Sequence, residues 1–134
     1  MERRRRLRLL LDTHAVLWWF NGDAALSPAA RAAIEPDDNQ IFVSAASAME
    51  VSTKHRVGKL PGAGTLTNRF EEMVEHEGFI PLQITLAHGA LGGRLPIAHK
   101  DPFDRLLIAQ ALLEGLTLVS NEAIFDQSGV ARLW

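Results

Sequence analysis

The sequence predicts an α/β fold in which a mainly parallel central sheet carries helices on both faces. Short apolar segments alternate with helical segments from one end of the chain to the other, the order of a parallel sheet with crossover helices. The 134 residues, 47% of them hydrophobic and 22% charged, are enough for one domain with a sizeable core. Because no repeat, low-complexity tract or linker divides the chain, we expect a single domain over residues 7–134, preceded by an Arg-rich extension over residues 1–6.

The chain is predicted to begin with a strand followed by two helices. The apolar run 7–12 is typical of a buried strand, and the apolar residues 13–20 form a helix that stops at the turn-forming residues 21–23. Ser27 is a good capping residue and Pro28 suits the first helical position, so a second short helix starts there.

A second strand and a longer helix follow the turn cluster at residues 36–39. Residues 40–44 have the apolar composition of a buried strand. Ser44 at its end can cap a helix that runs to about Val57, and Gly58 ends that helix as glycine commonly does.

The middle of the chain is predicted to hold a loop, an amphipathic helix, a strand and a short helix. Residues 59–64 form the loop, and the helix covers about 66–77, where apolar residues are spaced by three and four. Residues 79–84 follow as a strand. The short helix 86–91 is ended by the glycine pair behind it.

The last third of the chain is predicted to hold one strong helix and two strands. A connector over residues 95–100 leads to a helix over 101–114, which Gly115 ends. Residues 117–120 then form a strand, and the final residues 132–134 add a short edge strand.

The composition excludes several classes of protein. The chain has no cysteine, so disulfides, thiolate zinc sites and a cysteine nucleophile are excluded. No apolar run approaches the ~18 residues that a membrane helix needs. The apolar stretch after the arginines is also too short for a secretory signal. We therefore expect a cytoplasmic protein that does not associate with a membrane.

The charge of the chain is unevenly distributed. The net charge is −2, and residues 1–6 hold four Arg and one Glu, or +3, so the other 128 residues carry −5. An Arg-rich terminus can contact phosphates, although a solvated, frayed end is the simpler interpretation. An acidic body is unusual for a plain nucleic-acid binder, and is less unusual for an enzyme whose acids are covered by bound cations.

Five acidic residues each lie at the end of a predicted strand, one turn beyond it, or at the opening of a helix. They are Asp12, Glu50, Asp101, Asp104 and Glu122. Because the carboxyl ends of parallel strands share one edge of the sheet, where ligands bind, we expect these side chains to converge there.

Each acid taken alone has a structural explanation. Asp12 is placed to cap a helix, and Asp101 with Asp104 fits a cap followed by an acid that favours the helix dipole. Glu50 can pair with Lys54 one helical turn later, and the fifth acid lies in a polar turn. Taken together, however, clustered carboxylates repel one another unless a cation or a proton compensates them.

The set of acids favours a hard metal ion. Mg²⁺ takes one or two carboxylates plus waters, and Mn²⁺ suits the same oxygens. Such an ion can ionise a bound water and stabilise charge on a phosphoryl oxygen, which is the chemistry of phosphodiester hydrolysis. The chain has no Gly-rich phosphate loop, and its five histidines lack the spacing of a zinc site. A metal-dependent hydrolase of phosphodiesters is the function that these residues favour.

Several motifs resemble those of the PIN-domain nucleases, specifically the VapC-like toxins of toxin–antitoxin pairs. The similarity covers nearly the whole chain in the right order, except for the Arg-rich start. The segments that carry it are Leu10-Leu11-Asp12-Thr13-His14, Val43-Ser44-Ala45-Ala46-Ser47 with Glu50, Gly58-Lys59-Leu60, residues 101–111 beginning Asp101-Pro102-Phe103-Asp104-Arg105, Leu118-Val119-Ser120-Asn121-Glu122 and Arg132-Leu133-Trp134.

This resemblance implies a Rossmann-like PIN fold, an α/β/α sandwich, and a Mg²⁺- or Mn²⁺-dependent endoribonuclease. It also implies a homodimer, an RNA substrate and neutralisation by a small cognate antitoxin. By position, Asp12 and Asp101 would be the principal metal ligands, and Glu50 and Asp104 would complete the acidic cluster, directly or through metal-bound waters.

The resemblance also gives roles to residues around the acids. Thr13 and Ser120 would orient carboxylates or water by hydrogen bonds. Arg105 would pair with the acidic cluster or contact phosphate. Glu122 would be the fifth catalytic acid, although members of the family commonly have Asp at this position, so its longer side chain departs from the pattern.

Two other functions are alternatives to the nuclease. The substitution at Glu122, with those at Met49, Ala98 and Ser128, allows a PIN-like module that binds antitoxin or RNA without turnover. A phosphoacceptor receiver domain has a similar size, but it needs an acidic pair after its first strand and a later lysine. Here Thr13 and His14 follow the first aspartate, and the chain has no lysine after Lys100.

Overall fold

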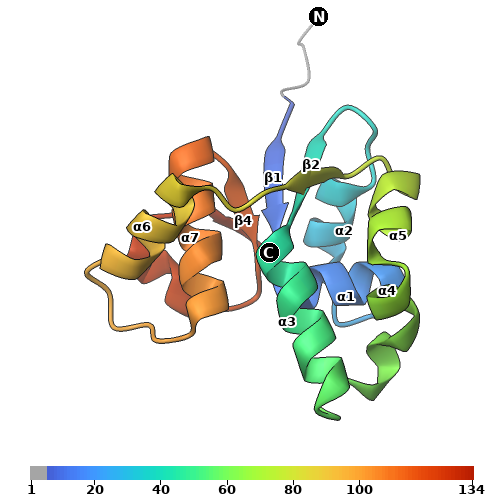
Figure 1. Cartoon of the computed structure of the whole chain (residues 1–134). Coiled ribbons are helices and arrows are strands. Elements are labelled where there is room, and N and C mark those ends of the chain that lie inside the picture. The colour runs from blue at the N-terminus through green and yellow to red at the C-terminus, as the bar shows by residue number, and fades with distance from the viewer. Residues whose placement is uncertain (1–5) are drawn as a thin grey trace, which may run out of the picture.

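The computed structural model describes residues 6–134 and contains a five-stranded parallel sheet (Figure 1). The strands lie in the spatial order β3-β2-β1-β4-β5, and every neighbouring pair is parallel. They are β1 (Arg8–Leu11), β2 (Gln40–Ser44), β3 (Ile80–Leu82), β4 (Thr117–Val119) and β5 (Arg132–Leu133). The predicted α/β fold with a parallel sheet is confirmed.

Helices connect the strands as the alternating pattern predicted. The α-helices are α1 (Thr13–Asn21), α2 (Pro28–Ile34), α3 (Ala45–Arg56), α4 (Gly64–Asn68), α5 (Phe70–His76), α6 (Leu86–Arg94) and α7 (Pro102–Glu114), and the 3₁₀ helices are η1 (Pro61–Ala63) and η2 (Ala123–Ser128). In Figure 1, α6 and α7 lie on one side of the sheet, and α1, α2, α4 and α5 lie on the other.

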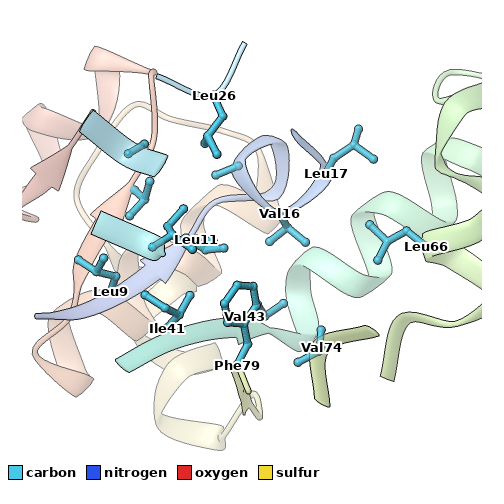
Figure 2. Packing of buried hydrophobic residues seen from close by; sticks show 14 of the residues in the cluster. Leu9, Leu11, Val16, Leu17, Leu26, Ile41, Val43, Leu66, Val74 and Phe79 are labelled. Carbon is cyan, nitrogen blue, oxygen red and sulfur yellow. The ribbon is translucent and has the colours of Figure 1, made fainter. Parts of the chain in front are cut away.

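Two apolar cores lie on the two faces of the sheet. In β1, Leu9 and Leu11 belong to one core, whereas Leu10 between them belongs to the other, as alternation along a strand requires. Figure 2 shows the first core, where Val16 of α1 and Val43 of β2 meet side chains from α2, α4 and α5. The second core lies between the sheet and α7. Because helices cover both faces, the middle residues of the central strands are apolar whichever face they point to.

The register of the sheet brings three strand ends to one level. Leu10 in β1 is aligned with Phe42 of β2 on one side and with Leu118 of β4 on the other. Directly after β1, the backbone N–H of Asp12 donates to the carbonyl of Val119 at 3.0 Å. The residues that follow these strands therefore share one edge of the sheet.

The predicted amphipathic helix over 66–77 is wrong in one respect, because it is two helices. Arg69 separates α4 from α5 with a backbone of φ −135° and ψ 29°. The apolar residues on both sides of this break, Leu66 and Val74, still pack into the same core. The spacing of the apolar residues predicted the buried face correctly, but it did not predict the break in the helix at Arg69.

The glycine pair predicted to end the helix 86–91 lies inside α6, which continues to Arg94. Gly92 is buried, and a Cβ at this position would lie 3.3 Å from the carbonyl oxygen of Arg105 in α7. Glycine at this position allows α6 to approach the backbone of α7 closely. The glycine pair therefore serves helix packing, and not the helix end that the sequence predicted.

The ends and lengths of elements differ slightly elsewhere. The strand predicted over 79–84 is limited to β3, and the loop predicted over 59–64 contains η1. The predicted Arg-rich segment 1–6 lies outside the described residues except for Arg6, which is exposed. In residues 6–134, no helix combines the length and the apolar character that crossing a membrane would require.

Candidate active site

Asp12 lies directly after β1 and is 3% exposed. Its Oδ1 accepts a hydrogen bond of 2.8 Å from the backbone N–H of Ala15, so it caps α1, and the Ser120 hydroxyl donates a second bond to the carboxylate. Burial raises the pKa of Asp12, the hydrogen bonds from Ser120 and Ala15 and the charge of His14 oppose this rise, and Glu122 adds to it. Asp12 therefore caps α1 and is also affected by the charge of a second acid, Glu122.

Glu50 lies in the second turn of α3 and is also buried. Its Oε1 accepts a hydrogen bond of 2.6 Å from the Thr13 hydroxyl, and its Oε2 accepts one of 2.5 Å from the Lys54 ammonium. The hydroxyl oxygens of Thr13 and Ser47 are 3.2 Å apart. Both carboxylate oxygens of Glu50 therefore already have partners from the chain itself.

Asp101 and Asp104 open α7, and each makes a different contact. Asp101 caps the helix, because its Oδ1 accepts from the backbone N–H groups of Phe103 at 2.8 Å and Asp104 at 3.2 Å. Asp104 Oδ2 is hydrogen-bonded to His99 Nε2 at 2.8 Å. The His99 ring in turn lies edge-on to Phe125, with ring centroids 5.8 Å apart.

The charges of three other acids act on the carboxyl of Asp104. Its pKa is raised to about 6, chiefly by burial and next by the charge of Asp101. The hydrogen bond from His99 lowers it, and the charges of Glu122 and Glu50 raise it further. The edge of the sheet therefore brings together side chains from α3, from the opening of α7 and from the segment after β4.

Glu122 joins this group mainly through its charge. It is half-buried, and its backbone N–H donates to the Ser120 hydroxyl oxygen at 3.0 Å. Its charge raises the pKa of both Asp12 and Asp104. The same Ser120 side chain therefore contacts the Asp12 carboxylate and the backbone of the turn that carries Glu122.

The chemistry of the donor set fits a hard divalent cation. Among the described residues, no group of three or more His, Asp or Glu side chains is already arranged to hold a metal ion. Mg²⁺ does not require such a group, because it keeps several waters and binds proteins through one or two carboxylates. Asp101 uses Oδ1 for its helix cap, which leaves Oδ2 as a carboxylate oxygen suited to that role. At Asp12 a cation would share the carboxylate with the hydrogen bonds from Ala15 and Ser120.

The hydrogen-bond partners of Arg105 are not the acids or a phosphate, as the resemblance had implied, but backbone carbonyls. Its guanidinium donates to five backbone carbonyls in α6 and in the connector to α7, at distances between 2.6 and 3.2 Å. These carbonyls belong to Gly92, Gly93, Leu95, Ile97 and His99. The donors that a phosphate or carboxylate would need are therefore occupied, and the residue fixes the connector in place.

Sequence reasoning gave too little weight to two residues of the site. The sequence indicates Lys54 only as a partner of Glu50. In the structure its pKa is raised by the hydrogen bond to that carboxylate, and further by the charges of Asp101 and Asp104. His99 lies two residues before Asp101 in the sequence, and its hydrogen bond is to Asp104. Its i+5 separation from Asp104 crosses the start of α7, so no helical spacing indicates the contact.

A groove of about 490 Å³ lies away from the acids, between the β2–α3 junction, α4, α5 and β3. Its lining includes Val43, Phe70, Val74 and Leu82, and none of the five acids belongs to it. The candidate active site is therefore identified by its carboxylates and their charges, and not by a deep cavity.

Residues 9–130 match the sequence model of the PIN domain family, which is most of the chain. No curated protein matches the sequence significantly.

Solved structures from toxin–antitoxin complexes have a similar fold. One is the VapBC2 complex of Rickettsia felis bound to a promoter DNA fragment, with 14% identity, 94% of this chain and 97% of that chain covered, and a TM-score of 0.68. DNA-bound VapBC of Salmonella typhimurium has 17% identity, coverage of 94% and 96%, and a TM-score of 0.66. A Klebsiella pneumoniae toxin–antitoxin complex has 20% identity, coverage of 85% and 86%, and a TM-score of 0.61.

Proposed function

The chain belongs to the PIN-domain family, and from this premise we propose that it is a metal-dependent endoribonuclease that acts as the toxin of a toxin–antitoxin pair. The observation that carries the proposal is the mutual influence of the acids. The carboxyl of Asp104 has a pKa of about 6 because it is buried beside Asp101, with Glu122 and Glu50 adding to the effect. Such a concentration of carboxylates is suited to holding a cation.

In the proposed mechanism Asp12 and Asp101 are the principal metal ligands, and Glu50, Asp104 and Glu122 complete the acidic cluster directly or through waters. Mg²⁺ or Mn²⁺, when bound, supplies the activation of water and the stabilisation of charge on the RNA phosphate. The two principal carboxylates are held in place by backbone N–H groups at the starts of α1 and α7. Such fixed positions lower the cost of organising the site when substrate binds.

The hydroxyl groups beside the acids keep the carboxylates in position. Ser120 donates to Asp12, and Thr13 donates to Glu50, so each hydroxyl restrains an acid from a neighbouring strand or helix. The contact between Asp104 Oδ2 and His99 Nε2 gives the site a place where a proton can be held at neutral pH. We propose that Asp104 and Glu122 help to accept the proton lost by the attacking water.

The proposed partners are a small cognate antitoxin and a second copy of the chain. The similar solved chains come from complexes described as VapBC or toxin–antitoxin complexes, which supports an antitoxin for this protein as well. Homodimerisation and an RNA substrate are carried over from the resemblance to VapC-like toxins. An enzyme that acts on cellular RNA and is controlled by such a partner would work in the cytoplasm.

A second candidate function is a PIN-like module that binds antitoxin or RNA without turnover. Glu122 favours it, because a glutamate replaces the usual aspartate and reaches one methylene farther. Both of the Glu50 carboxylate oxygens are also already paired with Thr13 and Lys54.

One experiment separates these two functions. Purified protein, freed of any antitoxin, is mixed with end-labelled RNA while Mg²⁺ or Mn²⁺ is titrated and then removed with EDTA. Cleavage that depends on the metal supports the nuclease. Saturable RNA binding with no cleavage at any metal concentration would instead establish the binding module.

A further inference from the structure

We propose that Lys54 is the residue of this site that contacts an RNA phosphate, and that Glu50 acts as a positioning residue that holds the Lys54 ammonium. This inference rests on the proposed ribonuclease function. It changes the expected role of Glu50, which the family resemblance places among the metal ligands.

The contacts of Glu50 favour this assignment. Its side chain is only 4% exposed, and both of its carboxylate oxygens accept hydrogen bonds, one from Thr13 at 2.6 Å and the other from Lys54 at 2.5 Å. A metal ion that bound directly would have to share these oxygens with both donors, and one of them, the Lys54 ammonium, carries a charge of the same sign as the ion. A buried carboxylate held by a hydroxyl and an ammonium is instead stable as it stands, because its charge is compensated.

The position of Lys54 suits contact with a substrate. Its side chain is 33% exposed, so the ammonium group is held by a buried partner and still reaches the surface of the site. A lysine ammonium has three N–H donors. In the described part of the chain, the hydrogen bond to Glu50 is the one that this ammonium makes, which leaves two donors for phosphate oxygens.

The charges around the site give Lys54 a function there. RNA must bring its phosphates close to five acids, and like charges repel. The Lys54 ammonium is bonded to Glu50, which Thr13 also holds, and Thr13 directly follows the proposed metal ligand Asp12. A positive charge therefore lies beside the acids.

Two other cations near the acids, Arg105 and His99, are already engaged. The Arg105 guanidinium is bonded to five backbone carbonyls, and His99 is bonded to Asp104. Lys54 therefore keeps donors available for a phosphate, whereas Arg105 and His99 do not.

The test measures RNA binding without cleavage. Binding of a labelled single-stranded RNA of about 20 nucleotides is followed by fluorescence anisotropy in EDTA at several salt concentrations. Lys54→Met removes the charge and keeps most of the apolar stem. Lys54→Arg keeps the charge, and Lys59→Met is the matched control, because Lys59 is exposed in the turn after α3.

We expect Lys54→Met to bind RNA roughly tenfold more weakly at low salt, the size of one lost charge-assisted hydrogen bond. The slope of log K against log salt should become shallower by about 0.7, which corresponds to one phosphate contact on a single strand. Lys54→Arg should keep the wild-type slope, and Lys59→Met should leave both affinity and slope unchanged. A Lys54→Met slope equal to that of the wild type would overturn the inference.

The role of Glu50 is tested by metal affinity, which does not depend on turnover. In calorimetric titrations with Mn²⁺, Glu50→Gln should have an affinity closer to that of the wild type than to that of Asp101→Asn. An affinity as low as that of Asp101→Asn would make Glu50 a ligand and overturn its positioning role. The circular dichroism spectrum of each variant checks that it has folded.

The outcomes also distinguish this inference from the proposed function. If the wild type cleaves RNA with Mg²⁺ while Lys54→Met keeps the wild-type salt slope, only the inference fails. If the wild type neither binds nor cleaves RNA, the nuclease function fails and the inference fails with it.

Discussion

Asp12 and Asp101 each perform a structural task with one carboxylate oxygen. Oδ1 of Asp12 caps α1, and Oδ1 of Asp101 caps α7, where Pro102 occupies the first helical position. Each residue has two interpretations in the sequence, a helix cap or a metal ligand, and the geometry shows that the two roles are compatible. A parallel sheet produces this combination naturally, because helices begin at the same edge at which ligands bind.

The double role of Asp12 gives a prediction that compares two substitutions. Asn keeps a capping oxygen and removes a buried charge, whereas Ala removes both. In metal-free protein at pH 7, Asp12→Ala should have a free energy of unfolding about 1 kcal/mol lower than Asp12→Asn, measured by urea denaturation. Equal stability of the two variants would show that the cap contributes nothing.

Asp104 predicts how the stability of the metal-free protein depends on pH. Its pKa in the folded protein is about 6, against an ordinary value of 3.8, so folding favours the protonated carboxyl. The associated stability is fully present below about pH 4 and is lost as the pH rises through about 6. At pH 7 the raised pKa lowers the free energy of unfolding by about 3 kcal/mol at most. This value is an upper limit, because the Asp104 side chain is 17% exposed and solvent screens its charge.

Asp104→Asn provides the comparison for this effect. The free energy of unfolding of the wild type, relative to that of the variant, should fall between pH 4.5 and pH 7 in EDTA. Thermal or urea unfolding at both pH values measures the difference. A relative stability that rises over this interval would contradict the raised pKa of Asp104.

At the scale of elements, the strand and helix pattern was largely predictable because periodicity and end signals agree. Ser44, Asp101 and Gly115 mark helix ends where the structure has them. The errors arose where tertiary packing decides the local structure. Gly92 lies within α6 because it packs against α7, and the helix break at Arg69 follows no strong breaker residue. Single-sequence signals contain neither kind of information.

Arg105 shows how one residue joins two elements. Its five hydrogen bonds go to carbonyl oxygens, and carbonyls have no sequence signature, so the adjacent acids were the natural but incorrect partners to predict. With these bonds the residue fixes α6 and the connector against the start of α7, where Asp101 and Asp104 lie. The geometry of the proposed site depends on this contact.

Arg105→Lys should destabilise the protein by about 3 kcal/mol or more, because a single ammonium cannot serve five carbonyls that the planar guanidinium reaches together. Urea denaturation measures the loss. Arg94→Lys, at the exposed end of α6, is the matched control and should change the free energy of unfolding by less than about 0.5 kcal/mol. If the two variants were equally stable, the connector would not depend on Arg105.

At the scale of the whole molecule, the order of the strands determines which residues can form a site. β1 lies between β2 and β4, so the residues after these three strands meet although more than 100 positions separate Asp12 from Ser120 in the sequence. The convergence of the acids was predictable from the position of each acid in its βα unit. The hydrogen bond between Lys54 and Glu50 was also predictable, from the spacing of four within one helix. The hydrogen bond between His99 and Asp104 was not, because it depends on the path of the connector.

The PIN fold also limits what the molecule can do with its acids. The sheet edge carries carboxylates from several elements, and the structure places one lysine and one histidine in contact with them. The proposed function therefore depends on a cation that is added to this edge. Removing a principal ligand should stop catalysis while the fold persists, since the helix caps survive an Asp-to-Asn change.

The most direct test of this account is RNA cleavage by the wild type and by Asp101→Asn at saturating Mg²⁺. The account predicts metal-dependent cleavage by the wild type and none above background by Asp101→Asn. The variant should still unfold in a single transition at a temperature close to that of the wild type, because asparagine also caps α7. Cleavage by Asp101→Asn at the wild-type rate would contradict the account.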